Sequence, residues 1–531
     1  MSPDPTHTYD IRIRNVLLVS FLVRLIISFT VELGNDEVYY WTYSQHLQWN
    51  YFDHPPMIAL LIRLFTLNLQ LESFPVFLRL GSLFCSALST YFLYRLTREI
   101  HNARAGYLAA LMYTGSLYAS VIAGLMIMPD SPQMVFWTLS LWALVRIQKE
   151  NSWKAWIGFG LFSGLCILSK VHGAFLWIGW LAYLLSFQRK AFFSPKMYAS
   201  LFITLLLSSP IFIWNFLNDF ITYRFHSERV QIGKSGVSLL FFLRELSGQI
   251  LYNNPVLVFL GIISIYWFRN FKGDLKAKKV LVLFNWIALP MILTVLAISL
   301  FRETLPHWAG PAYITLMPLT AIYFETHKDR KKVSWPIPLA IGLILLFLMA
   351  TVFFTRFYSG TLIPESGNSH EFSDSLGMGD ITLDLSGWEG AGKAFRGFIQ
   401  NEMKKEGRKI PPPLLVENWF PGAHLAYYFA RPIGMPVIGI SKPWNLHQFL
   451  WSNKYILETK PDMDTCYALV LSNLPYNPVK LYSTYFRTIK PLGKFISYRG
   501  NPIQGWKISR NFYVYRLSGF KGKASDLPFA K

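Results

Sequence analysis

One short polar stretch contains several of the residues that can do chemistry in an otherwise apolar chain. The stretch 34–56 includes Asp36, Glu37, Asp53 and His54. A carboxylate in such a group can take or steer a proton in a transfer reaction, and acids close to apolar segments are costly and usually functional. The alternative is that Asp36 only caps a helix, a common role for Asp.

Further candidates stand at the ends of apolar runs. Asp130 lies in a Pro-Asp-Ser-Pro turn, where it is either a second functional acid or an ordinary turn residue. Three basic residues, Lys170, Arg302 and His307, follow or precede apolar segments. They can stabilise an anion that develops in a reaction, or can place their charges at a membrane surface without any catalytic role.

A metal or a nucleotide is not indicated. The side chains of His46, Asp53 and His54 offer nitrogen and oxygen ligands, but such sets are more often polar networks, so we expect no metal cofactor. The chain has no GxxxxGK[ST] loop, and Gly158 and Gly160 lie inside an apolar segment, where they indicate helix packing. Three isolated cysteines predict no disulfide framework.

The elements that position these residues are predicted to be membrane helices. Of 531 residues, 52% are hydrophobic and only 15% charged, which excludes an ordinary soluble protein, and a formal charge of +21 in so apolar a chain favours membrane-flanking loops over a nucleic-acid surface. A span needs about 20 apolar residues. Candidate runs predict about eleven spans, at 15–33, 74–93, 104–126, 132–147, 155–168, 172–187, 198–216, 238–268, 279–301, 308–324 and 335–356. The segment 57–70 is better interpreted as an amphipathic or re-entrant helix.

The sidedness of the loops follows from their cations. Alternate loops contain groups such as Arg95 with Arg98 and Arg189 with Lys190, which predicts that they are cytoplasmic. The opposite face then includes the stretch 34–56, the loop 217–237 and everything after residue 357. All the candidate residues are therefore expected on the outer face of the membrane.

After Phe357 the composition becomes turn-rich and mixed polar, which predicts a separate soluble α/β domain. We therefore divide the chain into a transmembrane catalytic domain, 1–356, and an outer domain, 357–531. Strands are predicted at 414–416, 467–471 and 505–517, and helices at 392–404 and 479–489.

With these patterns in place, the order of the motifs resembles that of GT-C glycosyltransferases, polytopic enzymes that use a polyprenyl-phosphate sugar (glycosyltransferase family 39/83 type). They include protein O-mannosyltransferases and lipid A aminoarabinose transferases (ArnT-like). The similarity covers roughly residues 10–325 and is carried by these segments: Gly34-Asn35-Asp36-Glu37, Tyr51-Phe52-Asp53-His54-Pro55-Pro56, Met128-Pro129-Asp130-Ser131-Pro132, Leu168-Ser169-Lys170 and Leu305-Pro306-His307-Trp308-Ala309-Gly310-Pro311. The segment Ser386-Gly387-Trp388-Glu389-Gly390 is similar to the start of the outer domain in many bacterial members.

The resemblance implies a role for each candidate. Asp36 would be the catalytic base, supported by Glu37, and Asp130 a second acid near the acceptor or the sugar. Lys170, Arg302, His307, His54 and Asp53 would bind the donor phosphate or substrate. Where the aminoarabinose transferases have Glu-Lys before the double proline, this chain has Asp53-His54, which argues against transferring their substrate to it.

We therefore expect an inverting glycosyltransferase of the bacterial inner membrane, with its site open to the periplasm. Its partners would be an undecaprenyl-phosphate sugar as donor and an envelope acceptor such as lipid A or lipopolysaccharide, with no nucleic acid. Protein O-mannosylation is the alternative within the class, and a transporter or lipid flippase the alternative outside it. The loop 217–237 either covers the site as a lid or docks on the outer domain. Candidate contacts for a glycan are Trp388, Glu389, Glu417, Asn418 and Trp419, although the tryptophans can equally be buried core residues.

Overall fold

The computed structural model describes residues 5–231, 236–268, 274–327, 335–363, 380–459, 461–471 and 478–522. The chain divides into two compact units, each made of two segments. The first unit is Met1–Ile26 with Leu47–Phe347, and the second is Ile27–His46 with Leu348–Lys531. Our predicted boundary at residue 356 separates membrane from periplasm and stays a prediction. The division by compactness differs from it, because the stretch that carries Asp36 belongs to the second unit.

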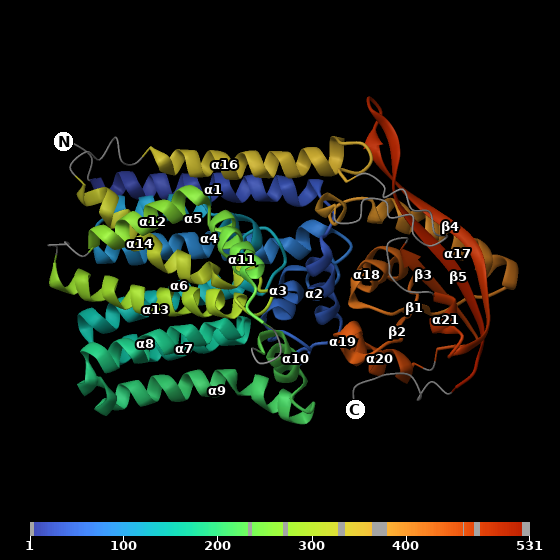
Figure 1. Cartoon of the computed structure of the whole chain (residues 1–531), viewed down its shortest axis with the longest axis horizontal. Coiled ribbons are helices and arrows are strands. Elements are labelled where there is room, and N and C mark those ends of the chain that lie inside the picture. The colour runs from blue at the N-terminus through green and yellow to red at the C-terminus, as the bar shows by residue number, and fades with distance from the viewer. Residues whose placement is uncertain are drawn as a thin grey trace. The chain divides into compact units, whose positions relative to one another are not determined.

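The first unit is helical (Figure 1). Its helices in chain order are α1 (Pro5–Thr30, whose last turn belongs to the second unit), α3 (Met57–Phe65), α4 (Pro75–Ile100), α5 (Ala103–Gly115), η1 (Tyr118–Ile122), α6 (Asp130–Glu150), α7 (Trp153–Ser169), η2 (Val171–Gly173), α8 (Ala174–Phe187), η3 (Arg189–Phe193), α9 (Pro195–Leu217), α10 (Ile221–Val230), α11 (Leu239–Tyr252), α12 (Pro255–Phe268), α13 (Leu275–Ser299), η4 (Pro306–Ala309), α14 (Gly310–Thr326) and α16 (Pro336–Val352, shared with the second unit).

Several of these helices are apolar enough to cross a membrane. Among the described residues, five helices have the required length and hydropathy, at His7–Thr30, Pro75–Ile100, Pro195–Leu217, Leu275–Ser299 and Pro336–Phe357. The run that we predicted as one span at 238–268 is broken into α11 and α12, which meet at 96°. The helices Trp153–Ser169 and Val171–Phe187 are apolar but shorter. The chain is thus a multi-pass membrane protein, and the number eleven stays a prediction.

The helix α3 is one of the segments whose role the sequence anticipated. It covers Met57–Phe65, and its buried residues Ile58, Ala59 and Ile62 lie on one side. At about 1.5 Å of rise per residue, nine residues cannot cross the hydrocarbon. This agrees with the interpretation of 57–70 as an amphipathic segment.

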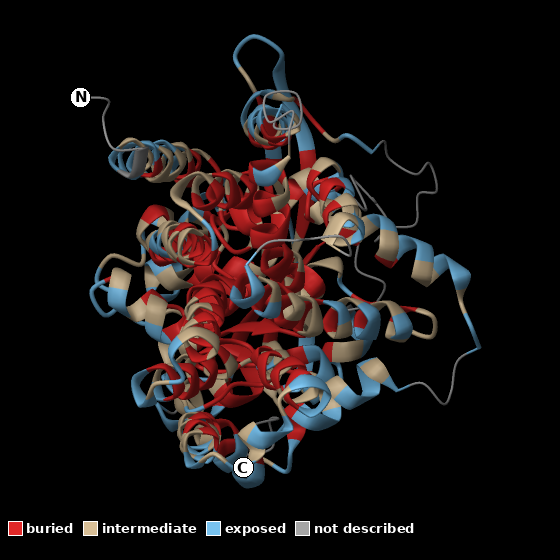
Figure 2. Ribbon diagram, turned by 90° about the vertical axis from the view of Figure 1, so that its left-hand side faces the viewer, coloured by how far each residue is buried: buried red, intermediate tan, exposed pale blue. Residues whose placement is uncertain are grey.

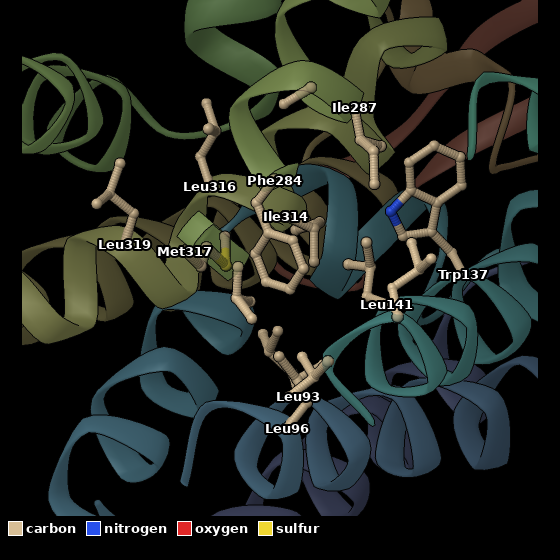
Figure 3. Packing of buried hydrophobic residues seen from close by; sticks show 14 of the residues in the cluster. Leu93, Leu96, Trp137, Leu141, Phe284, Ile287, Ile314, Leu316, Met317 and Leu319 are labelled. Carbon is tan, nitrogen blue, oxygen red and sulfur yellow. The ribbon is translucent and has the colours of Figure 1, made fainter. Parts of the chain in front are cut away.

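Large apolar side chains form the core of the first unit (Figure 3). They come from α4, α6, α13 and α14 and include Leu93, Trp137, Phe284 and Met317, which are all buried. Around this core, Figure 2 shows exposed and intermediate residues on the outer sides of the helices. Phe202, Leu206 and Phe259 are among the exposed ones, and in a membrane protein such residues face lipid.

Glycine allows two of the helices to touch. A Cβ atom on Gly160 would lie 2.5 Å from the backbone oxygen of Ser200, so α7 and α9 approach closely at this point. Small residues at helix contacts are typical of membrane proteins, where close backbone packing stabilises helix pairs. The sequence interpretation of Gly160 as a packing residue is therefore confirmed.

The second unit contains a sheet with strand order β2-β1-β3-β5-β4. The strands are β1 (Leu414–Val416), β2 (Val437–Gly439), β3 (Thr465–Leu471), β4 (Phe486–Asn501) and β5 (Gly505–Phe520). β1 pairs in parallel with β2 and β3, whereas β5 pairs antiparallel with β3 and β4. The helices are α2 (Asn35–Gln45), η5 (Phe353–Phe357), η6 (Ile381–Leu383), α17 (Trp388–Glu406), α18 (Trp419–His424), η7 (Leu425–Ala430), η8 (Arg431–Ile433), α19 (Pro443–Leu446), α20 (Phe449–Glu458) and α21 (Pro478–Tyr482).

The predicted α/β character of the outer domain is confirmed, with one error. The predicted strands and the helix at 392–404 are present within β1, β3, β5 and α17. The helix predicted at 479–489 is wrong after Tyr482, because β4 begins at Phe486 and pairs with β5. The first residues of β4, from Phe486 to Ile489, do not alternate between buried and exposed, so their local pattern does not indicate a strand. Strand pairing thus overrides the local pattern.

The helix α2 belongs to the second unit because its aromatic side chains pack there. The ring of Tyr39 lies 5.1 Å from the ring of Trp419, and Trp41 lies 5.1 Å from Tyr427. Aromatic pairs at such distances stabilise beyond the area they bury. We predicted that these aromatics lie at headgroup depth in the membrane interface, whereas the structure buries them in a protein core.

Candidate functional site

A buried ion pair lies at the centre of the candidate site in the first unit. The Lys170 Nζ atom lies 2.9 and 2.7 Å from the two carboxylate oxygens of Asp130, and both side chains are almost fully buried. Asp130 begins α6 and Lys170 follows the last residue of α7. Since a lysine ammonium has three N–H groups, and two of them serve Asp130, one remains for another acceptor.

A tyrosine holds the same carboxylate from the other side. The Tyr118 hydroxyl donates to Asp130 Oδ1 over 2.9 Å, and its ring is fully buried. A Cβ atom on Gly310 would lie 2.4 Å from that ring, so only glycine at this position leaves room for Tyr118. This contact gives a structural reason for the glycine in the segment Leu305–Pro311.

Histidines from four separate segments lie around the ion pair. The electrostatic influence of Lys170 and Asp130 reaches His54, His172 and His307, and that of Lys170 also reaches His226. The rings of His54 and His226 are 6.2 Å apart, and the Nε2 atom of His226 lies 2.8 Å from the backbone oxygen of Asp53. The structure thus brings together Asp53, His54, Asp130, Lys170 and His307 of the predicted residues.

These histidines are held in their neutral form. Burial, together with the charge of Lys170, lowers the pKa of His54 to about 4 and that of His307 to about 3. Burial likewise lowers the pKa of His226. At neutral pH these side chains can therefore donate or accept hydrogen bonds but contribute no positive charge. Our expectation that His307 acts as a cation does not describe this state.

The helix α10, inside the loop 217–237, packs against the site. The Arg229 guanidinium lies 5.6 Å from the ring centre of Trp308, and the ring of His172 lies 5.7 Å from the same tryptophan. His226 of α10 contacts Asp53 as described above. The described part of this loop therefore adds basic groups to the site, and its role as a lid stays a prediction.

Arg302 is engaged elsewhere in the first unit. Its Nε atom donates to the backbone oxygen of Gln231 over 2.9 Å. It is not among the strongest charges that act on the histidines, whereas Arg229 influences both His226 and His307. Arg229 is thus a further basic group near the histidines, and the role of Arg302 at the donor stays a prediction.

A second buried acid lies beside an apolar cavity. Glu245 of α11 accepts hydrogen bonds from Thr304 and Gln249, at 2.7 and 2.8 Å, and Gln249 accepts one from Tyr313 at 2.9 Å. Tyr313 also lines a cavity of about 260 Å³ between α11, α12, α13 and α14. Its other walls are mainly aliphatic, including Ile250, Leu257, Ile262, Leu289, Ile292 and Leu316.

Asp36 and Glu37 lie in the second unit, at the first turn of α2. Glu37 is fully buried, and its Oε2 atom accepts a hydrogen bond from the Gly34 N–H at 2.8 Å. Asp36 is partly exposed. Since the N-terminus of a helix favours negative charge, the site stabilises the Asp36 carboxylate as an anion.

Of the candidate glycan contacts in the outer domain, Trp388 and Glu417 are buried, whereas Asn418 and Trp419 are partly exposed. Trp388 is fully buried, with its ring stacked 3.8 Å from the ring of His424. The ring of Trp419 packs on His447 at 5.6 Å, and Glu417 is 6% exposed. Glu389 is exposed and stays a candidate.

The ligand set considered for a metal is divided between the two units. His46 stacks on Tyr455 at 4.0 Å in the second unit, whereas Asp53 and His54 belong to the first. Within the described ranges, no three His, Cys, Asp or Glu side chains are grouped so as to hold a metal ion.

Sequence reasoning did not select Tyr118, His172, His226, Arg229 or Glu245 as site residues. Glu245 carried a usable signal, since a lone acid in an apolar run is unusual. Tyr118 and His172 carried none, because each lies between apolar segments whose packing only the folded chain defines.

With this geometry described, comparison with known proteins confirms the resemblance to GT-C glycosyltransferases that the motifs indicated. Residues 53–214 match the model of the dolichyl-phosphate-mannose-protein mannosyltransferase family. The fold is that of ArnT from Cupriavidus metallidurans. The structure of ArnT bound to undecaprenyl phosphate has a TM-score of 0.59 at 13% identity, covering 94% of this chain and 97% of that one. The apo structure has a TM-score of 0.56 at 12% identity over the same shares.

Among curated proteins, the chain is similar to the lipid A galacturonosyltransferase RgtD of Rhizobium johnstonii. The two are 23% identical over 327 residues, which is 60% of this chain. The match spans 66% of the relative, slightly less than two thirds of its length.

A first prediction concerns the charge balance of the buried pair. Replacing Lys170 by Met leaves the Asp130 carboxylate buried without its cation, which should lower the free energy of unfolding by about 3–5 kcal/mol. The double variant Asp130→Asn with Lys170→Met removes both charges and should recover much of this loss. The measurement is the thermal unfolding midpoint of the purified protein. A double variant less stable than Lys170→Met alone would contradict the prediction.

A second prediction concerns pH. Because the pKa values of His54 and His307 in the folded protein lie below the ordinary value near 6.5, the unfolded chain binds more protons between about pH 6.5 and 4. The stability that these neutral histidines contribute is present above pH 6.5 and is lost as pH falls toward 4. The variant His307→Gln should therefore lose less thermal stability than the wild type between pH 7 and pH 5. An unchanged pH dependence would show that His307 is not buried in its neutral form.

Proposed function

We propose that the protein is an inner-membrane glycosyltransferase that moves a sugar from a polyprenyl-phosphate carrier to an envelope acceptor on the periplasmic face, with lipid A or lipopolysaccharide as the acceptor. The observation that carries the proposal is the buried group around Lys170, which offers one free ammonium N–H and several neutral imidazoles to an anion. The fold shared with ArnT and the similarity to RgtD support the same class of reaction.

In the proposed reaction, an acceptor hydroxyl attacks the anomeric carbon of the donor sugar. The new C–O bond forms while the bond from that carbon to the phosphate oxygen breaks, and the electron pair leaves with the lipid phosphate. The remaining N–H of Lys170 and the N–H groups of the histidines stabilise the charge on this phosphate. Asp130 holds Lys170 in place through both of its carboxylate oxygens.

Asp36 is the base in this proposal. Glu37 supports it by accepting the hydrogen bond from the Gly34 N–H, which stabilises the first turn of α2. The hydroxyl proton passes to the Asp36 carboxylate as the new glycosidic bond forms. One such base is sufficient for an inverting transfer. A partly exposed carboxylate can meet an incoming acceptor, whereas the buried Glu37 cannot.

The apolar cavity suits part of the donor's isoprenyl chain. Its aliphatic walls match a hydrocarbon tail, and its edge is formed by Tyr313, whose hydroxyl is held by Gln249. Burial of such a tail stabilises a complex by about 25 cal/mol for each Å² of apolar surface. Binding of the donor would then depend on the open space between α11 and α14.

A third prediction tests the base. Cells that express the wild-type chain, no chain, or the Asp36→Asn variant at equal membrane abundance are compared by mass spectrometry of lipid A, core lipopolysaccharide and envelope glycoproteins. Removal of a general base should lower the rate by about 10²–10⁴-fold. We expect one molecular species to lose the mass of one sugar in both the deletion and the Asp36→Asn cells.

The matched control for this experiment is Asp219→Asn. Asp219 is exposed in the loop after α9 and has a φ of 53°, a conformation that Asn tolerates. It should behave as wild type. A mass loss confined to glycoproteins would favour the protein O-mannosyltransferase alternative. A deletion phenotype without any sugar loss would favour a transporter or flippase.

A fourth prediction tests the cavity. Gly261 lines it, and the nearest atom to a Cβ placed there is 4.0 Å away, so Gly261→Leu would fill the space without a clash in the backbone. We expect this variant to need a higher donor concentration for half-maximal rate. Gly342→Leu is the control, since Gly342 also has room for a side chain but lies in α16, outside the cavity. Equal effects of the two substitutions would contradict the prediction.

A further inference from the structure

The start of α2 and the residues before it are bound by groups from the distant C-terminal part of the same unit. Glu32 accepts a hydrogen bond from the N–H of Trp388 at 2.8 Å, and the Leu33 N–H donates to the Tyr428 hydroxyl at 2.7 Å. Asn35, the residue before Asp36, contacts His424 with its Oδ1 atom 2.8 Å from Nε2. The start of α2 is therefore fixed by partners far away in the sequence.

The orientation of the Asn35 amide follows from its two partners. Asp384 is hydrogen-bonded to the Asn35 side chain, and because a carboxylate accepts, the Asn35 NH₂ group must be the donor. The Oδ1 atom of Asn35 then accepts from His424, which requires that His424 carries its proton on Nε2. The amide is thus bound at both of its ends.

The tautomer of His424 is fixed by its surroundings. The side chain is fully buried, and its Nδ1 atom has no hydrogen-bond partner within the described ranges. Its ring stacks on Trp388 at 3.8 Å with an interplanar angle of 6°, and the Arg510 guanidinium lies 4.1 Å from the centre of the Trp388 ring. Burial and the charge of Arg510 lower the pKa of His424 well below its ordinary value. The neutral Nε2–H form is therefore the stable one.

We infer that His424, with Asp384, is a positioning residue for the Asp36 carboxylate: it holds Asn35 and thereby sets the place and direction of the first turn of α2. The inference rests on the proposed function, since it assigns a purpose to the contact only if Asp36 is the base. It also explains the Ser386-Gly387-Trp388-Glu389-Gly390 segment. The buried Trp388 ring supports His424, and the Trp388 N–H binds Glu32, so this segment acts on the transfer reaction without touching the substrate.

The size of the expected effect follows from how strongly transfer rates depend on placement. A displacement of a reacting group by about 1 Å can lower a rate by about 10²-fold. Without the His424 N–H, the Asn35 amide should be free to rotate and the first turn of α2 should shift. The affinity of the first unit for the donor should stay the same. The turnover number should therefore fall and the KM for the donor should change little.

The test compares His424→Leu with the conservative variant His424→Gln. Leu removes the donor while keeping an apolar side chain of similar size, and the Gln amide can still donate to Asn35. Purified variants in nanodiscs are supplied with a total lipid extract of the deletion strain, which contains both unmodified acceptor and endogenous donor. The measurements are the initial rate of the one-sugar mass gain against extract concentration, its pH profile, and the thermal unfolding midpoint.

We expect the maximal rate of His424→Leu to fall at least tenfold and its pH profile to shift, while the extract concentration for half-maximal rate stays unchanged. The His424→Gln variant should recover most of the wild-type rate. If the Leu variant is folded and as active as the wild type while Asp36→Asn is inactive, the positioning role is wrong and the proposed function stands. If Asp36→Asn is itself fully active, the assignment of the base is wrong and the positioning inference falls with it. A third outcome is that the rate of the Leu variant falls only in proportion to its content of folded protein and that the Gln variant is equally impaired. His424 would then be a core residue without a positioning role.

Discussion

The burial of a charged pair is the constraint on which the helical unit depends. An ammonium and a carboxylate that leave water lose several kcal/mol of hydration each, and only close, well-directed contact compensates for this loss. Asp130 and Lys170 meet this condition because the end of α7 and the start of α6 place them 2.7 Å apart, with Tyr118 completing the carboxylate's partners. The glycine at 310 then follows from the space that the Tyr118 ring needs. Residues distant in the sequence are thus tied to one electrostatic requirement.

Burial keeps the surrounding histidines neutral by lowering their pKa values, and the charge of Lys170 acts in the same direction. Lys170 already supplies the positive charge, and a second cation beside it in a buried place would be repelled. An arriving phosphate changes this balance, since a negative charge near His54 and His307 favours their protonated forms. In the proposed reaction, the site would therefore gain positive charge only when the anionic donor is bound.

The helical membrane character was predictable from the sequence, because long hydrophobic runs report directly on membrane insertion, whereas the sidedness inferred from loop cations stays a prediction. The motifs around Asp36, Asp130 and Lys170 likewise indicated the class of protein. The contact between Asp130 and Lys170 was not predicted. Asp130 is the first residue of α6 and Lys170 follows the last residue of α7, so only the packing of these two helices brings them together. The break between α11 and α12 did carry a local signal that the hydropathy of the run 238–268 obscured: Asn253 and Asn254 precede Pro255, a helix is disfavoured at the residue before a proline, and Asn254 has a φ of 70°. The place of α2 was missed because its aromatics suit a membrane interface and a protein core equally well.

The discontinuous make-up of the second unit has a consequence for how the chain is made. Its first segment, 27–46, is synthesised before residues 47–347 of the helical unit, whereas the partners of α2, Trp419, Tyr427 and His447, follow that unit. Until these residues are made, the buried aromatic side chains of α2, such as Tyr39 and Trp41, lack the rings on which they pack in the folded protein. A chain that stalls before residue 419 would therefore contain the Asp130–Lys170 pair but would leave the aromatic face of α2 without its later partners.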